Sequence, residues 1–137
     1  MANNAIAAAE PVGLTDYFVQ ENGVTFAGRH MLVDLWGAGH LTNIGYIERT
    51  LREAADAAKA TVLAVKLHQY SDSGGVSGVA ILAESHISIH TWPERDYAAL
   101  DIFMCGTCNP HDSLPVLESA FDATSTSVNE IRRGVVA

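Results

Sequence analysis

The sequence lacks long hydrophobic runs and has only two cysteines. No apolar stretch reaches the roughly 18–20 residues that span a bilayer, so we expect no transmembrane helix. The apolar segment 5–9 is shorter than the hydrophobic region of a secretory signal and has no basic flank, so we expect no signal peptide. Both cysteines lie in one Cys-x-x-Cys segment, 105–108, which leaves no disulfide framework. These absences favour the cytoplasm as the compartment.

Basic residues are also scarce. Eight Lys and Arg residues stand against 16 Asp and Glu residues, and the formal net charge is −8. An acidic surface disfavours nucleic acid as a partner and is compatible with a cationic ligand, although solubility alone is the simpler explanation. With 48% hydrophobic and 18% charged residues, the 137-residue chain is expected to bury the core of one folded domain.

Periodicity predicts an N-terminal arm followed by the order β-α-β-β-β-β-α-β. The arm covers residues 1–26, with partial order at 17–19, and residues 27–137 form one domain. The expected strands are 30–36, 61–68, 76–83, 87–92, 97–105 and 125–136. The expected helices are 44–59, capped near Asn43, and 110–121, capped by Asn109.

The central strands follow one another as hairpins, which favours a mainly antiparallel sheet. The fold class is therefore α+β, an α/β sandwich in which two helices back one face of the sheet. The predicted strands are apolar on both faces, so the face without helices needs a cover. We expect a homodimer in which two sheets pack against each other, giving four layers, αββα.

The stretch 83–94 reads Ala-Glu-Ser-His-Ile-Ser-Ile-His-Thr-Trp-Pro-Glu, an apolar strand interrupted by an acid, hydroxyls and imidazoles. Polar groups in a core strand either find partners or take part in chemistry. His90 lies five residues after Ser85, which places it on the opposite face and ~16 Å away along a straight strand. His90 would then serve the Ser85 of a second chain, which favours a site shared across the dimer.

The position of Cys105 follows from the hairpin that closes after this stretch. If Trp92 pairs with Tyr97, Cys105 lies opposite Glu84, and a shift of one residue puts it opposite Ser85. Directly opposed residues lie about 5 Å apart. A thiol is therefore expected beside Glu84 and Ser85 of its own chain.

Three generic interpretations of these residues stay open. Ser85, His90 and an acid would suit a hydrolase triad, but the sequence has no Gly-x-Ser-x-Gly elbow. Cys105 and Cys108 would suit a redox pair or half of a zinc site. Composition alone favours the third interpretation, in which these are satisfied strand residues. His86 and His90 are ~13 Å apart on a strand, so we expect no metal site.

A long interrupted motif distinguishes these interpretations. Its segments are Gly75-Val76-Ser77-Gly78, Glu84-Ser85-His86, Ile89-His90-Thr91-Trp92-Pro93-Glu94, Tyr97-Ala98-Ala99, Asp101-Ile102-Phe103 and Cys105-Gly106. The motif resembles that of the small prokaryotic S-adenosylmethionine decarboxylase proenzymes, most strongly over 76–106. Gly-Arg-His and Val-Asp within 28–34 extend the resemblance over most of the chain. The resemblance implies the same α/β sandwich and the same sheet-to-sheet homodimer.

The resemblance also implies that the chain cuts itself between Glu84 and Ser85, into residues 1–84 and 85–137. The Ser85 hydroxyl attacks the Glu84 carbonyl, and elimination followed by loss of ammonia leaves a pyruvoyl group at the new N-terminus. This self-derived cofactor forms a Schiff base with the substrate amine and takes up the electrons released as CO2 leaves. The substrate implied is S-adenosylmethionine, and the product is the aminopropyl donor for spermidine synthesis.

Further residues match roles known in the family. Ser77 and His90 match the processing residues, a hydroxyl that polarises the scissile carbonyl and a base. Cys105 matches the acid that reprotonates the substrate α-carbon, and Glu94 matches the carboxylate that binds the ribose hydroxyls. With the strand geometry above, Ser85 and Cys105 come from one chain, and His90, Glu94 and Ser77 from its partner.

The loop before Ser77 departs from the family pattern. Relatives have His-Arg-Phe and a short Pro-containing turn, whereas residues 68–75 read His-Gln-Tyr-Ser-Asp-Ser-Gly-Gly, one residue longer. Tyr70 would replace the Phe that stacks on adenine. Asp72 either caps the turn or binds a distal cation. The loop leaves open a pyruvoyl-dependent arginine or ornithine decarboxylase or, in another class, an unprocessed protein that binds an adenosyl ligand.

Overall fold

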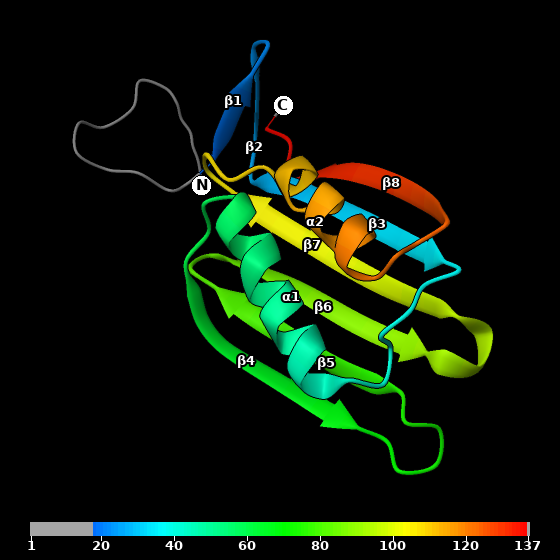
Figure 1. Cartoon of the computed structure of the whole chain (residues 1–137). Coiled ribbons are helices and arrows are strands. Elements are labelled where there is room, and N and C mark those ends of the chain that lie inside the picture. The colour runs from blue at the N-terminus through cyan, green and yellow to red at the C-terminus, as the bar shows by residue number, and fades with distance from the viewer. Residues whose placement is uncertain (1–17, 137) are drawn as a thin grey trace.

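A computed structural model of the chain describes residues 18–136 (Figure 1). Its main element is a six-stranded antiparallel sheet of order β4-β5-β6-β7-β3-β8. The strands are β3 (Gly28–Trp36), β4 (Val62–Gln69), β5 (Val76–Leu82), β6 (Ser85–Trp92), β7 (Tyr97–Cys105) and β8 (Ser125–Arg133). The helices α1 (Ile44–Ala57) and α2 (Leu114–Ala120) both lie on one face of this sheet (Figure 1). The predicted α+β class and the one-sided helices are confirmed.

An additional hairpin precedes the sheet, made of β1 (Val19–Glu21) and β2 (Val24–Phe26). Its turn is Asn22-Gly23, and both residues have positive φ, 52° and 81°. Asn-Gly is the pair that two-residue hairpin turns with positive φ favour, so this signal was present in the sequence. Partial order was expected at residues 17–19. Of these, Val19 begins β1 and Phe18 precedes it, while Tyr17 lies outside the described residues. The domain boundary after residue 26 stays a prediction.

The first helix forms where its cap and its periodicity predict it. The Asn43 side chain accepts a hydrogen bond from the Tyr46 N–H at 3.0 Å and so caps α1. One face of α1 is buried against the sheet, with Ile47 and Leu51 fully covered. Neither helix in the described part of the chain has the length and hydrophobicity needed to cross a membrane.

The second helix differs from the prediction, because residues 110–121 do not form one helix. A 3-10 turn, η3, covers Pro110–Asp112, and α2 begins again at Leu114. Pro115 has no N–H to bond back to the preceding turn, which is why the helix restarts there. The buried Ser113 hydroxyl instead donates to the Ala54 carbonyl of α1 at 2.6 Å and fixes the two helices together.

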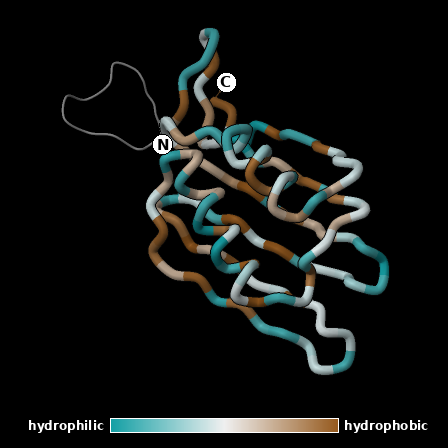
Figure 2. The backbone as a smooth tube through the Cα atoms, in the orientation of Figure 1, coloured by the Kyte–Doolittle hydropathy of each residue, from teal (hydrophilic) through white to brown (hydrophobic). Residues whose placement is uncertain are grey.

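The helix-facing side of the sheet forms the hydrophobic core. Alternate residues of the strands point to this side, which is why hydrophobic and polar segments follow one another along the strands in Figure 2. The core strand residues are Met31, Val33, Leu35, Val76, Ala80, Leu82, Ile87, Ile89, Ala98, Leu100, Ile102 and Met104. The last strand, β8, lies at the sheet edge and is exposed along most of its length.

The face without helices, which we call the open face, is mixed rather than apolar. Large hydrophobic side chains are exposed on it, with relative exposures of 40% for Leu32, 44% for Trp36 and 40% for Trp92. Between them lie ionisable and hydroxyl side chains, namely His30, Asp34, Ser77, His86, Ser88, His90 and Asp101. The expectation that the strands are apolar on both faces is therefore wrong, because one face carries most of the polar groups singled out above.

Candidate active site

The predicted scissile bond lies in the tight turn between β5 and β6. Leu82 pairs with Ser85, so Ala83 and Glu84 are the two turn residues and β6 begins at Ser85. Glu84 has a φ of 66°, in the left-handed region that residues with a side chain seldom adopt. Such a conformation costs about 1–3 kcal/mol and persists only where the surroundings impose it. The residue before Ser85 is thus held in a strained conformation.

Cys105 lies beside this turn, as the hairpin register predicts. Trp92 pairs with Tyr97, and the Cys105 Sγ donates a hydrogen bond to the Glu84 carbonyl oxygen at 2.9 Å. The Cys105 N–H donates to the Ser85 Oγ at 3.3 Å. The thiol, the serine hydroxyl and the carbonyl group of the predicted scissile bond therefore lie together within one chain.

The Cys105 thiol is in an environment that keeps it protonated. Burial raises the pKa of Cys105 above its ordinary value, and the electrostatic effects of Glu84 and Cys108 raise it further. The hydrogen bond with Ser85 acts in the opposite direction and is smaller than the effect of burial. A thiol with a raised pKa is a suitable proton donor at neutral pH and a poor nucleophile.

Ser77 and His90 meet at the other end of β6. The two residues are directly opposed on β5 and β6, and the Ser77 Oγ lies 2.9 Å from the His90 Nδ1. Because β6 is unbroken from Ser85 to Trp92, this pair lies at the opposite end of the strand from Ser85. The Ser77–His90 pair is on the open face and is not brought to the Ser85 of its own chain.

The predicted substrate-binding residues lie at the same end as His90. Glu94 is exposed in the short η2 turn (Pro93–Arg95) that follows β6. Tyr70 directly follows β4 and is 49% exposed. Its ring contacts the His68 ring edge-on, with 4.7 Å between the centroids. Asp72 is exposed and pairs with no other described residue, whereas the Ser73 hydroxyl accepts from Gly75 and closes the turn. The alternative in which Asp72 caps the turn is therefore wrong, because Ser73 makes the capping hydrogen bond.

A group of ionisable residues on the open face was missed by the sequence analysis. The ligand atoms of His30, His86 and Asp101 lie within 4.8 Å of one another. The buried His30 Nε2 is 3.4 Å from an Asp101 oxygen, although without the geometry of a hydrogen bond. Arg133 lies 3.1 Å from the other ring nitrogen of His30 and can only donate, so the proton belongs on Nε2.

This tautomer matters because a ligating imidazole nitrogen must be unprotonated. With the proton on Nε2 and Nδ1 accepting from Arg133, His30 is neutral and offers no free nitrogen to a metal ion, so its approach to Asp101 is a contact between an imidazole N–H and a carboxylate. The expectation of no metal stays a prediction. The sequence signal for the group was weak, because it depends on β3 lying beside β7, so that His30 and His86 both oppose Phe103.

Aromatic side chains form a row at the His90 end of the open face. Tyr97 stacks between Trp36 and Trp92, with centroid distances of 4.3 and 5.2 Å. The Tyr97 hydroxyl donates to Asp34 at 2.6 Å, and this bond, with burial and the Asp34 charge, raises the pKa of Tyr97 to about 12. Direct cross-strand pairing of the three rings makes the row rigid.

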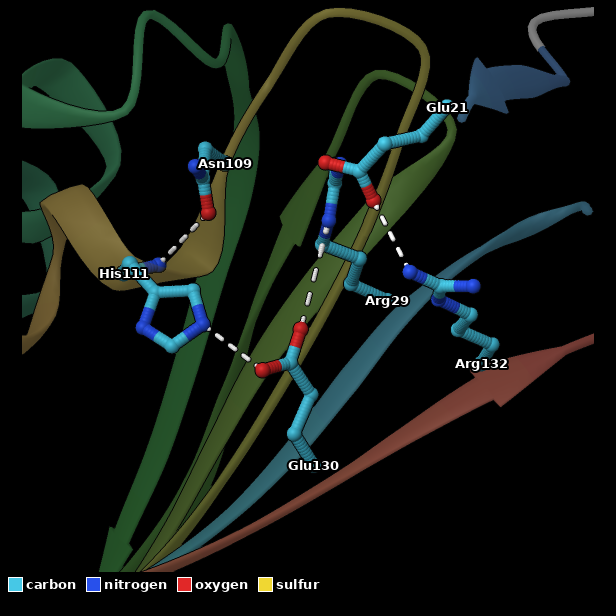
Figure 3. Close-up of a pocket in the computed structure, with 6 residues that line it drawn as sticks. All are labelled: Glu21, Arg29, Asn109, His111, Glu130 and Arg132. Carbon is cyan, nitrogen blue, oxygen red and sulfur yellow. Dashed lines mark hydrogen bonds and ion pairs between the residues drawn. The ribbon is translucent and has the colours of Figure 1, made fainter. Parts of the chain in front are cut away.

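A charged pocket of about 530 Å³ lies where the N-terminal hairpin meets the main sheet (Figure 3). Its lining residues are Glu21, Arg29, Asn109, His111, Glu130 and Arg132. Opposite charges face one another across it: Arg29 and Arg132 contact Glu21 at 2.9 and 3.2 Å, and His111 contacts Glu130 at 2.7 Å (Figure 3). None of the predicted site residues lines this pocket, and its charges are used to hold β1 against β3 and β8.

Comparison with known proteins identifies the family. A model of the S-adenosylmethionine decarboxylase family matches residues 29–134. The S-adenosylmethionine decarboxylase proenzyme of Thermomicrobium roseum is 42% identical over 110 residues, which cover 80% of this chain and 95% of that protein. The proenzyme of the same name from Methanococcus maripaludis strain S2 is 45% identical over 112 residues, covering 80% and 91%.

A solved structure has the same fold. The adenosylmethionine decarboxylase from Aquifex aeolicus VF5 superposes with a TM-score of 0.71 at 28% identity, over 82% of this chain and 94% of that one. From its sequence and its fold, the chain belongs to the S-adenosylmethionine decarboxylase family.

Proposed function

We propose that this chain is a self-processing proenzyme that becomes a pyruvoyl-dependent decarboxylase of S-adenosyl-L-methionine. The observation that carries the proposal is the contact of the Cys105 thiol with the Glu84 carbonyl oxygen, next to the Ser85 hydroxyl, in a member of this family. A serine, a strained peptide and a hydrogen-bond donor to the carbonyl are the groups that backbone cleavage at a serine needs.

The chain's own residues supply the processing step. The Ser85 oxygen attacks the carbonyl carbon of Glu84, the peptide C–N bond breaks, and an ester with a free amine on residue 85 results. Elimination then breaks the ester bond, releases residues 1–84 with a carboxylate at Glu84, and leaves dehydroalanine. Addition of water releases ammonia and leaves the pyruvoyl carbonyl. Relief of the positive φ at Glu84 favours the first step.

In the decarboxylation, Cys105 is the proposed proton donor. The pyruvoyl group supplies a carbonyl that accepts electrons from the substrate as CO2 leaves. The Cys105 thiol, kept protonated by burial, then delivers a proton to the substrate α-carbon. Because Cys105 already lies against residues 84 and 85, no large movement is required.

The residues at the other end of β6 complete the site of a second chain. His90 and Ser77 are hydrogen-bonded on the open face, far along β6 from Ser85, so packing of two open faces is required to bring them to a Ser85. The exposed Leu32, Trp36 and Trp92 provide hydrophobic contacts for this homodimer. In this arrangement Glu94 binds the ribose and Tyr70 stacks on the adenine of the neighbouring site.

We propose the cytoplasm as the compartment of the chain, where the reaction product would supply the aminopropyl group for spermidine synthesis. A second candidate is a decarboxylase of arginine or ornithine. It is favoured by the exposed Asp72 carboxylate, which pairs with no other described residue and would suit a distal cation.

Mass analysis under denaturing conditions and CO2 assays test these proposals together. We expect two fragments that separate between Glu84 and Ser85, with a pyruvoyl-capped C-terminal fragment, and CO2 release from S-adenosylmethionine. Release from arginine or ornithine alone would establish the second candidate. A persistent single chain that binds S-adenosylmethionine without releasing CO2 would instead show an unprocessed binding protein.

A further inference from the structure

Cys108 belongs to the Cys-x-x-Cys segment and has no part in the proposed reaction. Its N–H donates to the Cys105 carbonyl at 3.2 Å, which closes a four-residue turn directly after β7. Gly106 inside this turn has a φ of 61°, a conformation that suits glycine. The turn is therefore a stable local structure and not an irregular strand end.

This turn brings the two cysteines to the separation of a disulfide. In a β-turn the first and fourth Cα atoms lie within about 7 Å of each other. Disulfides join Cα atoms that are about 4.4–6.8 Å apart. The turn between Cys105 and Cys108 is thus compatible with the Cα separation of a disulfide, and the two side chains must turn from their present partners for the sulfurs to bond.

Each thiol is at present held by a different carbonyl group. The Cys105 Sγ donates to Glu84 at 2.9 Å, and the Cys108 Sγ donates to Lys59 at 3.5 Å. Thiols are weak donors, so both contacts are readily exchanged for a covalent bond. Both cysteines are free and half-buried.

We propose that Cys105 and Cys108 are a thiol oxidation site, at which a hydroperoxide converts the pair into a reversible disulfide that removes the proton donor. The switching role rests on the proposed function of Cys105. In the first step one sulfur attacks the peroxide oxygen, forming a sulfenic acid and releasing water or an alcohol. The second thiol then attacks the sulfenic sulfur and releases water. Two thiols are oxidised, one peroxide is reduced, and the two thiol hydrogens leave in the products.

The order of the two steps follows from the environment of Cys105. Burial raises its pKa and so lowers its thiolate fraction, which makes Cys105 a poor first target for a peroxide. We therefore assign the first oxidation to Cys108 and the second attack to Cys105. Disulfide formation withdraws the Cys105 sulfur from the Glu84 carbonyl position, so the proton donor is lost while the fold is retained.

The test uses the processed protein, with both fragments present, obtained from the full-length chain. It is treated with hydrogen peroxide and then with an alkylating agent. We expect the fragment 85–137, which holds both cysteines, to lose about two mass units and to resist alkylation. Decarboxylation should fall at least tenfold in step with the disulfide, and dithiothreitol should restore both. The proposal would be overturned if both thiols of the wild type could still be alkylated after treatment with excess peroxide. It would also be overturned if the disulfide form kept full activity.

Cys108→Ser is the matched control. It should keep the wild-type rate when reduced, be inactivated more slowly by peroxide, and gain oxygen mass instead of losing two hydrogens. If it were inactivated at the wild-type rate, Cys108 would have no role. If the variant fails to fold, the wild type can be alkylated with one reagent before reduction and with a second reagent after it. The two labels then show whether Cys108 had been oxidised. A chain that forms the disulfide but never releases CO2 would refute the proposed function and the switching role, leaving only the oxidation site.

Discussion

The two ends of β6 differ in what surrounds them. At the Ser85 end, a strained turn, a half-buried thiol and a serine hydroxyl lie in contact within one chain. At the His90 end, the Ser77–His90 pair lies on the open face beside the exposed residues that are proposed to bind the substrate. The groups proposed to act on the bond to be cut are held together by local pairing, whereas those proposed to bind substrate and to act as the base are exposed on the open face. In the proposed homodimer, one strand would therefore contribute to two half-sites.

The largest effect is expected from Ser85→Ala, which removes the proposed nucleophile at the Ser85 end of β6. Neither cleavage nor decarboxylation should occur, and activity should fall below about one-thousandth of wild type. Electrophoresis under denaturing conditions and CO2 release measure the two effects. Ser88→Ala on the same strand is the control and should still be cut. Normal cleavage of the Ser85 variant would mean that another residue is the precursor.

Mixing two inactive chains tests whether the two ends serve different sites. Ser85→Ala and His90→Ala chains, each uncut alone, should together regain cleavage, because one site of the heterodimer has both residues intact. Only the His90→Ala chain carries Ser85, so only that chain should be cut, which mass analysis can verify. Heterodimers that form but stay uncut would place His90 in the site of its own chain.

Replacing the thiol should separate its role from that of the nucleophile. Cys105→Ser is expected to lower the decarboxylation rate about 100-fold by weakening proton transfer. The wild-type rate should fall at high pH, as the thiol loses its proton, and the raised pKa places this fall above the pH of an ordinary thiol. The serine variant should lack this alkaline fall. An unchanged pH profile would assign proton donation to another group.

A smaller effect, on stability and not on the reaction, is expected at the charged pocket in Figure 3, none of whose lining residues belongs to β6. Arg29→Ala removes ion pairs to Glu21 and Glu130 and should cost about 1 kcal/mol of unfolding free energy, since these charges are partly exposed. Hydrogen exchange should increase in the β1–β2 hairpin with the cleavage rate unchanged. Glu48→Ala, which breaks an exposed pair with Arg52 on α1, should cost no more than about 0.5 kcal/mol.

Local pairing explains how far the sequence predicts the site. The position of Cys105 beside Glu84 follows from one hairpin, and the strand β7 agrees with its predicted bounds. The group of His30, His86 and Asp101 was missed because it requires β3 to lie beside β7, a pairing between distant segments. Periodicity carries no information on such pairings, although alternation alone places each residue on its face.

Two further differences have local physical causes. The Asn22-Gly23 turn was readable as a hairpin signal but lay in a segment of weak periodicity. The second helix was expected to be continuous because Pro110 starts a helical turn, whereas Pro115 has no N–H to bond back to that turn, and a separate helix begins at Leu114. The mixed open face shows that high overall hydrophobicity does not determine which face a polar residue takes.

The strand order β4-β5-β6-β7-β3-β8 has a consequence for the cleaved molecule. A cut after Glu84 leaves β3, β4 and β5 in one piece and β6, β7 and β8 in the other. The pieces interleave, because β3 of the first lies between β7 and β8 of the second, and β5 pairs with β6. Three ladders of backbone hydrogen bonds thus join the two fragments. They would behave as one cooperative unit that separates only when the sheet itself unfolds.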